Sequence, residues 1–360
     1  MLKALILFFA TFRLVFMEVV TSERHDMFRP GESSKNHSCS YVRHVPDELR
    51  SSDIMHPDGL DIFYQKYTEA YGIPVIASAE VPDNALKRAC YVVRFLFADN
   101  YAVRNSYYKR SGRVAVMGIN EKLTDIPETR WLPKSSNRYA GLGAIDGSPV
   151  CVSGEANILC HCNDIDFPND VFVHEVAHGV HLLGAKFGIN GWNNRLRKQY
   201  NVAKITGLWK DTYAMQSTEE YFAEGVMSFF NVKNHLEEPD GMDGPISTRN
   251  RLKEYDPVLY QLIREIFPCN NVYLKSCESD RDSESMQELK MDCKISDEDN
   301  IDSSITITEL IKIGGLRGKY KCIGECADKD PDCTEWANSG ECTKNPVYMF
   351  HKCRRSCDGC

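Results

Sequence analysis

The distribution of cysteine most constrains how this chain can fold. The sequence has 360 residues and 15 cysteines, and seven of these lie between Cys322 and Cys360. Disulfides persist in oxidising compartments, and they substitute for a hydrophobic core in segments too short to bury one. The cysteines therefore predict a small disulfide-rich module at the C-terminal end of a secreted protein. Because their number is odd, at least one is unpaired or pairs between chains.

The first residues are typical of a secretory signal peptide. Lys3 is followed by an apolar run over residues 4–10, and Arg13 interrupts the apolar residues that come next. The stretch is too short and too charged to span a bilayer, which needs about 20 apolar residues. We predict a signal peptide over residues 1–22, extracellular localisation and no stable membrane insertion. A retained membrane anchor is the alternative.

The composition changes along the chain and indicates separate segments. Residues 23–57 are polar, which suits a linker or propeptide, and they include the N-glycosylation sequon Asn36-His37-Ser38. Residues 58–268 are richer in apolar side chains, with short strand-like runs at 75–77 and 114–117 and helical spacing over 85–97. Residues 269–321 are acidic and rich in serine, as expected of a linker.

The charge of the chain argues against one class of partner. The net charge is −8, and no basic stripe runs through the sequence. Binding to nucleic acid needs clustered Lys and Arg to neutralise phosphates. We therefore expect no nucleic-acid partner.

His174-Glu175-Val176-Ala177-His178 matches the HExxH pattern. On a helix, positions i and i+4 share one face, so His174 and His178 can both reach one metal ion. Glu175 lies beside that face and is placed to take a proton from a metal-bound water. Asn169 can cap this helix and Gly184 can end it. The alternative is an amphipathic helix with incidental histidines.

A catalytic metal site needs a third protein ligand. His181 is too far from His174, because seven residues of helix span about 10 Å. Glu220 and Glu224 lie four residues apart on a second expected helix, so Glu220 can bind the metal and Glu224 can accept a hydrogen bond from a ligand imidazole. Tyr213 can stabilise an oxyanion at the open side of the metal. A solvated acidic face and a core tyrosine are the alternatives.

The HExxH pattern followed by Tyr213-x6-Glu220-Tyr221-Phe222-Ala223-Glu224 resembles the lethal-factor-like branch of the gluzincin metallopeptidases. The resemblance covers roughly residues 58–268 and implies an α+β zincin fold whose active-site helix carries HExxH. It further implies one zinc ion on His174, His178 and Glu220, water activation by Glu175 and assistance from Tyr213. The expected function is that of a secreted zinc metalloendopeptidase acting on protein or peptide substrates.

Cys326-x6-Cys333-x8-Cys342-x10-Cys353-x3-Cys357-x2-Cys360 resembles the ShK toxin-like (ShKT) domain, which we place at residues 322–360. Six cysteines alone allow 15 connectivities. The family pattern implies the pairs Cys326–Cys360, Cys333–Cys353 and Cys342–Cys357.

Channel-blocking ShK toxins use a Lys-Tyr dyad, whereas Val347 precedes Tyr348 here. We therefore expect this domain to dock a receptor or position a substrate, with a stabilising tail as the alternative. The competing hypothesis for the whole chain is a toxin-like binding protein that acts through the ShKT domain, with the metal domain as its scaffold.

Three weaker signals concern metals and cysteines. Residues 298–309 resemble an EF-hand calcium loop but carry Glu298 and Ser303 where Asp and Gly are preferred, so calcium binding competes with an acidic linker. Cys160-His161-Cys162 suggests disulfide partners rather than a metal site. The thiolate of Cys39 is a further candidate, as a latency switch at the open metal position.

Overall fold

The structure is a computed structural model. It describes residues 39, 41–50, 59–145, 147–161, 164, 166–273, 287–295, 328, 331–344, 349, 353 and 355–357. The predicted signal peptide, the sequon, the EF-hand-like loop and the pair Cys326–Cys360 lie outside these residues. Among the described residues, no helix is both long enough and apolar enough to cross a membrane.

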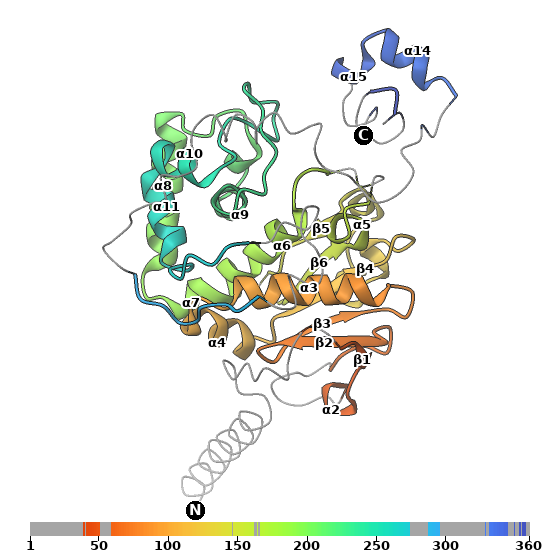
Figure 1. The fold of residues 1–360 in the computed structure, drawn as a ribbon. Helices are drawn as coiled ribbons and strands as arrows, with labels where there is room; N and C mark the ends of the chain where they lie inside the picture. Colours follow the sequence, from red (N-terminus) through yellow and green to blue (C-terminus); the bar gives the residue numbers. More distant parts are fainter. Residues whose placement is uncertain are drawn as a thin grey trace, which may run out of the picture.

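A six-stranded mixed sheet forms the centre of the larger described part (Figure 1). Its strand order is β1-β2-β3-β4-β6-β5. Strands β3, β4 and β6 run parallel, whereas β1, β2 and β3 pair antiparallel at one side and β5 pairs antiparallel with β6 at the other. The strands are β1 Arg43–His44, β2 Lys66–Ala70, β3 Ile73–Ala77, β4 Arg113–Met117, β5 Gly141–Leu142 and β6 Val150–Gly154.

Helices follow the strands and also form a second region after the sheet (Figure 1). The α-helices are α2 Asp47–Arg50, α3 Asp83–Leu96, α4 Tyr101–Lys109, α5 Glu155–Ile158, α6 Val171–Gly179, α7 Lys186–Gly188, α8 Trp192–Thr206, α9 Thr218–Phe229, α10 Arg249–Tyr255, α11 Pro257–Arg264, α14 Cys333–Asn338 and α15 Glu341–Lys344. Short 3₁₀ turns are η1 Leu123–Asp125, η2 Pro127–Thr129, η3 Lys134–Arg138 and η5 Tyr213–Met215. A π-helical segment, η4 Val180–Ala185, continues α6.

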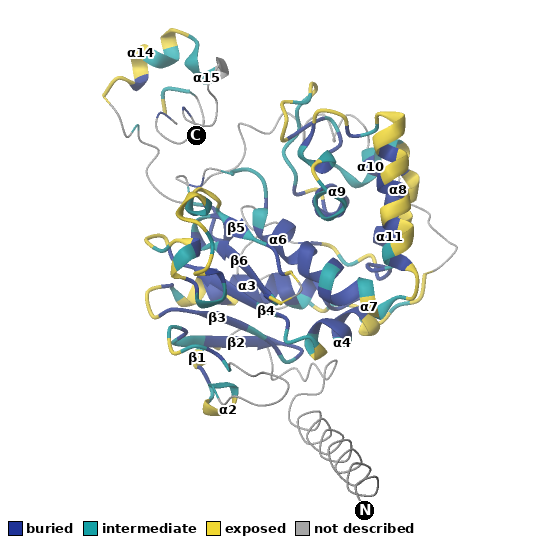
Figure 2. Cartoon of the chain, turned by 180° about the vertical axis from the view of Figure 1, so that it is seen from behind, coloured by how far each residue is buried: buried dark blue, intermediate teal, exposed yellow. Residues whose placement is uncertain are grey.

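The alternation of side chains along the strands gives the sheet two buried faces. Val114 and Val116 of β4 belong to the main core, whereas Ala115 between them belongs to a smaller core on the opposite face. This is the period of two expected of a strand. Buried residues accordingly dominate the central strands and the helices next to them (Figure 2).

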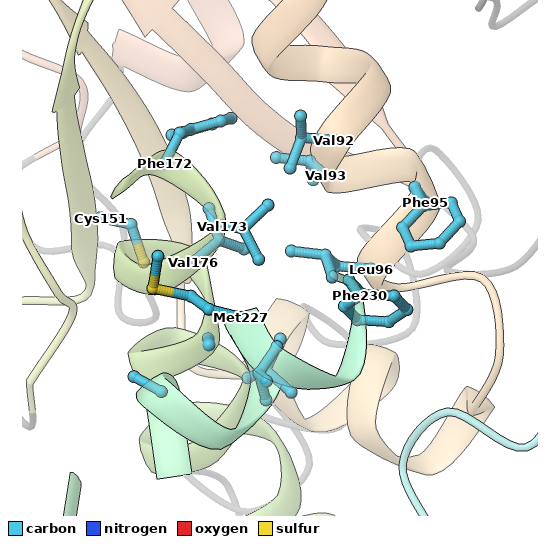
Figure 3. Close-up of a cluster of buried hydrophobic side chains, with 14 of the residues drawn as sticks. Val92, Val93, Phe95, Leu96, Cys151, Phe172, Val173, Val176, Met227 and Phe230 are labelled. Atoms are coloured by element: carbon cyan, nitrogen blue, oxygen red, sulfur yellow. The ribbon is translucent and has the colours of Figure 1, made fainter. Parts of the chain in front are cut away.

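The main core joins the sheet to α3, α6 and α9. Figure 3 shows Val93 and Leu96 of α3 beside Val173 and Val176 of α6, with Met227 of α9 completing the cluster. These side chains are at most 2% exposed. The apolar sides of all three helices therefore pack into one core. This packing determines where the polar side of each helix points.

The described secondary structure confirms the mixed α and β class expected from the sequence. The run at 75–77 lies in β3, the run at 114–117 lies in β4, and the helix expected over 85–97 is α3. Part of the polar N-terminal segment contributes more than a linker, since β1 pairs with β2.

The segment expected to be an acidic linker packs on the larger domain where the structure describes it, at residues 269–273 and 287–295. Arg104 of α4 is fully buried and donates two hydrogen bonds to Asp292, with distances of 3.0 and 3.1 Å. Gln287 accepts a hydrogen bond from Tyr91 of α3 at 2.7 Å. A disulfide between Cys269 and Cys293 closes this stretch.

The described cysteines confirm two of the three pairs implied by the ShKT resemblance, Cys333–Cys353 and Cys342–Cys357. These cysteines pack with Met349 in a small core of their own. Cys160 is also disulfide-bonded, as expected. The latency hypothesis for Cys39 is wrong, because its sulfur is bonded to that of Cys90.

Cys151 is the free cysteine among the described residues, and it is buried in β6 beside Tyr107. Burial raises the pKa of its thiol to about 12. Because the thiolate is the reactive form, we expect iodoacetamide at pH 8 to leave Cys151 unmodified in the native protein and to alkylate it in 6 M guanidinium. Peptide mass spectrometry measures both states. Rapid native labelling would contradict the buried position.

Asp256 links three helices through one fully buried carboxylate. It accepts hydrogen bonds from Gln199, Trp209, Tyr221 and the Leu259 amide that begins α11. Asp256→Ala leaves these buried donors unpaired, so we expect a loss of at least about 3 kcal/mol in the free energy of unfolding, measured with urea.

Asp83→Ala serves as the matched control for this measurement. The Asp83 side chain is 53% exposed and pairs with Lys66 at the surface. Its removal is expected to cost about 1 kcal/mol or less. Equal losses in the two variants would contradict the linking role of Asp256.

Candidate metal centre

Helix α6 carries the HExxH residues. It is stabilised by a capping residue at its start and by an apolar side that packs into the core. The Asp170 side chain accepts a hydrogen bond from the Val173 amide at 3.2 Å and so caps the helix, one residue later than expected. Gly184 does not end the helix, since η4 continues through it. A Cβ at Gly184 would lie 2.7 Å from Val103, which shows that this glycine serves close packing on α4.

The second ligand helix, α9, is capped by Ser217, whose side chain accepts a hydrogen bond from the Glu220 amide at 3.1 Å. Tyr221 and Phe222 are fully buried. Because these neighbours turn into the core, Glu220 and Glu224 lie on the side of α9 that contacts α6.

Three predicted ligand atoms converge between α6 and α9. The Nε2 atoms of His174 and His178 are 3.1 Å apart. One oxygen of Glu220 lies 2.9 Å from Nε2 of His174 and 3.4 Å from Nε2 of His178. Among the described residues, these three side chains form the group able to hold a metal ion.

The separations fit one ion at the centre of the group. With bonds of about 2.0–2.2 Å, tetrahedral geometry separates ligand atoms by roughly 3.3–3.6 Å and octahedral geometry by roughly 2.8–3.1 Å. The observed range of 2.9 to 3.4 Å spans both geometries. The donor set therefore suits a divalent transition metal without selecting the element.

Charge at the centre supports this arrangement. Burial acts to raise the pKa of Glu220, but the hydrogen bonds and the charges of His174 and His178 together outweigh burial and hold the pKa well below its ordinary value. Glu220 is therefore an anion facing two imidazoles. That pairing is the charge distribution that a cation bound between them requires.

Glu175 and Tyr213 border the same centre. Glu175 is buried, and this burial raises the pKa of its carboxyl group, against the effect of His174 and His178. Burial, together with the carboxylates of Glu220 and Glu175, raises the pKa of Tyr213 to about 12, so its hydroxyl keeps its proton at neutral pH. One side chain can thus accept a proton and the other can donate a hydrogen bond.

Glu224 lies behind the ligands, as the sequence predicts. Its Oε1 is 3.2 Å from Nδ1 of His174, and its side chain is 6% exposed. A carboxylate at this nitrogen favours the tautomer whose proton is on Nδ1 and leaves the Nε2 lone pair for a metal.

His181 stays outside the group, which confirms the interpretation from helix geometry. Its Nε2 lies 2.8 Å from Asn193, and its ring packs on Trp192 and Phe222.

The sequence reasoning missed two glycines at the site. A Cβ at Gly141 would lie 2.7 Å from Glu175, and one at Gly143 would lie 2.4 Å from Cβ of His178. Glycines stand at 141, 143 and 147, and this density is a sequence signal of close backbone approach. Lys233, discussed below, was also missed.

Comparisons with known proteins concern a small part of the chain. Residues 325–360 match the family described as ShK domain-like, which confirms the C-terminal module. Probable prolyl 4-hydroxylase 12 of Arabidopsis thaliana is 51% identical over 43 residues, which cover 10% of this chain and 15% of the hydroxylase. Peptidyl serine alpha-galactosyltransferase of Chlamydomonas reinhardtii is 56% identical over 36 residues, 10% of this chain and 5% of that enzyme.

A conotoxin, Im14.3 of Conus imperialis, is 45% identical over 31 residues, 9% of this chain and 42% of the toxin. The chain thus spans less than half the length of each of these relatives. No solved structure matches it. The zincin fold implied by the resemblance stays a prediction.

These relatives contradict the predictions of a zinc metalloendopeptidase and of zinc as its cofactor. Their names describe hydroxylation, glycosyl transfer and a toxin, and not peptide hydrolysis. The physical reason for the error is that the sequence pattern specifies donor atoms only. Two imidazoles and a carboxylate also form the ligand set of iron(II) oxygenases, so the donors fix neither the metal nor the reaction.

His181 gives the site region a measurable pH response. Burial lowers the pKa of His181 to about 4, against an ordinary value of 6.5. As the pH falls below 6.5, His181 becomes protonated in the unfolded chain but stays neutral in the folded chain. We expect this residue to remove about 2 kcal/mol of stability between pH 7 and pH 5.

Urea unfolding of the wild type and of His181→Gln, in metal-free buffer, measures this contribution. The variant keeps a polar side chain but does not titrate, so its stability should fall less over the same pH interval. Identical pH profiles of the two proteins would show that His181 is not held neutral.

Proposed function

We propose that this chain is an enzyme that works with one divalent transition-metal ion held by His174, His178 and Glu220. The convergence of one oxygen and two ring nitrogens, with separations of 2.9 to 3.4 Å between two packed helices, carries this proposal. A purely structural helix pair has no need to bury two histidines against a carboxylate, since buried polar groups are costly unless they are paired. When bound, such an ion would act as a Lewis acid on a ligand at its open positions.

The surrounding residues have separate roles in this proposal. Glu175 accepts a proton from the reacting ligand, because burial raises the pKa of its carboxyl group and so makes its carboxylate a stronger base. Tyr213 donates a hydrogen bond to negative charge that develops on that ligand. Gly141 leaves room beside Glu175, since a Cβ there would meet its carboxylate. Glu224 fixes the orientation of His174.

Measurement on the purified protein assigns the metal and the reaction class. The activities in the relatives' names are not transferred, because the hydroxylase and galactosyltransferase alignments reported above each cover a tenth of this chain. Elemental analysis of the purified protein for manganese, iron, cobalt, nickel, copper and zinc would identify the ion that it carries.

The ShK-like module and the disulfides bear on where the protein acts. Disulfides such as Cys39–Cys90 and Cys333–Cys353 suit an oxidising compartment, which supports secretion. We place the protein outside the cell, with the ShK-like module docking it to a receptor or substrate.

Metal titration tests the ligand assignment. We expect the wild type to bind one Co²⁺ ion, seen as visible absorption bands. His178→Ala and Glu220→Ala should each weaken Co²⁺ binding by more than about 100-fold, since the loss of outer-shell partners alone costs 10–100-fold. Glu175→Gln should retain the affinity, because Glu175 is outside the ligand group.

His235→Ala is the matched control, because His235 contacts Glu237 and Arg251 away from the ligand group. It should bind Co²⁺ like the wild type. Wild-type affinity in His178→Ala, with the variant folded by circular dichroism, would refute the metal site.

A further inference from the structure

Lys233 is a buried cation just beyond the C-terminal end of α9. Its side chain is 2% exposed. It forms one ion pair with Oε2 of Glu224 and a second with Asp243, whose Oδ1 lies 3.4 Å away. A lysine is rarely buried unless it is paired, so this position depends on those two carboxylates.

The Lys233–Glu224 pair continues directly to a ligand. Oε2 of Glu224 forms the ion pair with the ammonium group of Lys233. Its Oε1 lies 3.2 Å from Nδ1 of His174. The two oxygens of one carboxylate are thus engaged in different directions. A carboxylate with both oxygens held cannot rotate away from the imidazole without losing an ion pair in a dry environment.

The other end of this chain of contacts is anchored near the start of α6. Asp243 accepts hydrogen bonds from Asn234 at 2.9 Å and from Asn169 at 3.3 and 3.4 Å. Asn169 also accepts a hydrogen bond from the Asn234 amide, at 2.6 Å, and lies next to the cap of α6. Lys233 therefore connects the loop after α9, the outer carboxylate and the ligand helix.

We propose that Lys233 is a positioning residue for the metal centre. It holds Glu224 so that His174 keeps its Nδ1 proton directed at the carboxylate and its Nε2 lone pair directed at the ion. The inference rests on the proposed function, since it concerns affinity and geometry at that centre. It extends the centre to a residue that contacts none of the three ligands itself.

The test compares Lys233→Met, Glu224→Gln and the double variant in Co²⁺ titrations of the full chain. Methionine keeps the length of the side chain without its charge. We expect each single variant to bind Co²⁺ 10–100-fold more weakly than the wild type. The double variant should be no weaker than Glu224→Gln alone, because Lys233 acts through Glu224.

The absorption bands of Co²⁺ at saturation provide a readout that a general loss of stability would not change. Lys233→Met and Glu224→Gln should shift these bands in the same direction, since both release His174. Lys210→Met is the control, because the Lys210 side chain is 76% exposed and pairs with Asp211 at the surface. It should leave affinity and spectrum unchanged.

Two outcomes would overturn the inference and leave the proposed function intact. These are wild-type affinity and spectrum in Lys233→Met, or additive losses in the double variant, while His178→Ala still loses the metal. If Lys233→Met does not fold, Asp243→Asn tests the same link, and we expect about 10-fold weaker binding. Unchanged binding in that variant would equally refute the role of Lys233.

Discussion

The packing of α6 against α9 is the constraint on which the rest of the structure depends. Val173 and Val176 on one side of α6 enter the core shared with α3 and the sheet. The opposite side of α6 is then forced against α9, where it presents His174 and His178. Buried imidazoles need partners, and α9 supplies them as Glu220 and Glu224. The apolar core thus creates the polar centre by fixing which sides of two helices meet.

This packing brings the backbone of other elements so close to α6 that several positions leave no room for a side chain. The backbone of β5 and of the residue that follows it must approach α6 closely, so side chains are absent at Gly141 and Gly143. Gly179, one turn after Glu175 on the same face of α6, lies against Cys151 of β6, where a Cβ would be 2.7 Å from the sulfur. Helix α6 is therefore held by tight contacts along the face that it turns toward β5 and β6. Such confinement limits the movement of the imidazoles and prepares their geometry before an ion arrives.

The sequence predicts those features whose signal lies within a short stretch of the chain. Spacing within one helix is local, so four-residue intervals correctly placed His174 with His178 and Glu220 with Glu224 on common faces. Cysteine spacing with a family pattern gave Cys333–Cys353 and Cys342–Cys357.

Contacts between distant segments were not predictable in this way. The role of Gly141 depends on a strand pairing, the partners of Lys233 depend on a loop, and the pairing of Cys39 with Cys90 depends on the tertiary fold. None of these has a periodic signal along the chain.

The failure of the peptidase prediction has a different origin from these missed contacts. The side chains of His174, His178 and Glu220 do converge, as their spacing along two helices led us to expect. The identity of a metal depends on the coordination number and on the field around it, and the reaction depends on what the open positions admit. Those properties come from the residues behind and beside the ligands, among them Glu224, Lys233 and Tyr213. A ligand motif therefore locates a centre, whereas its surroundings, assembled from separate parts of the chain, decide its chemistry.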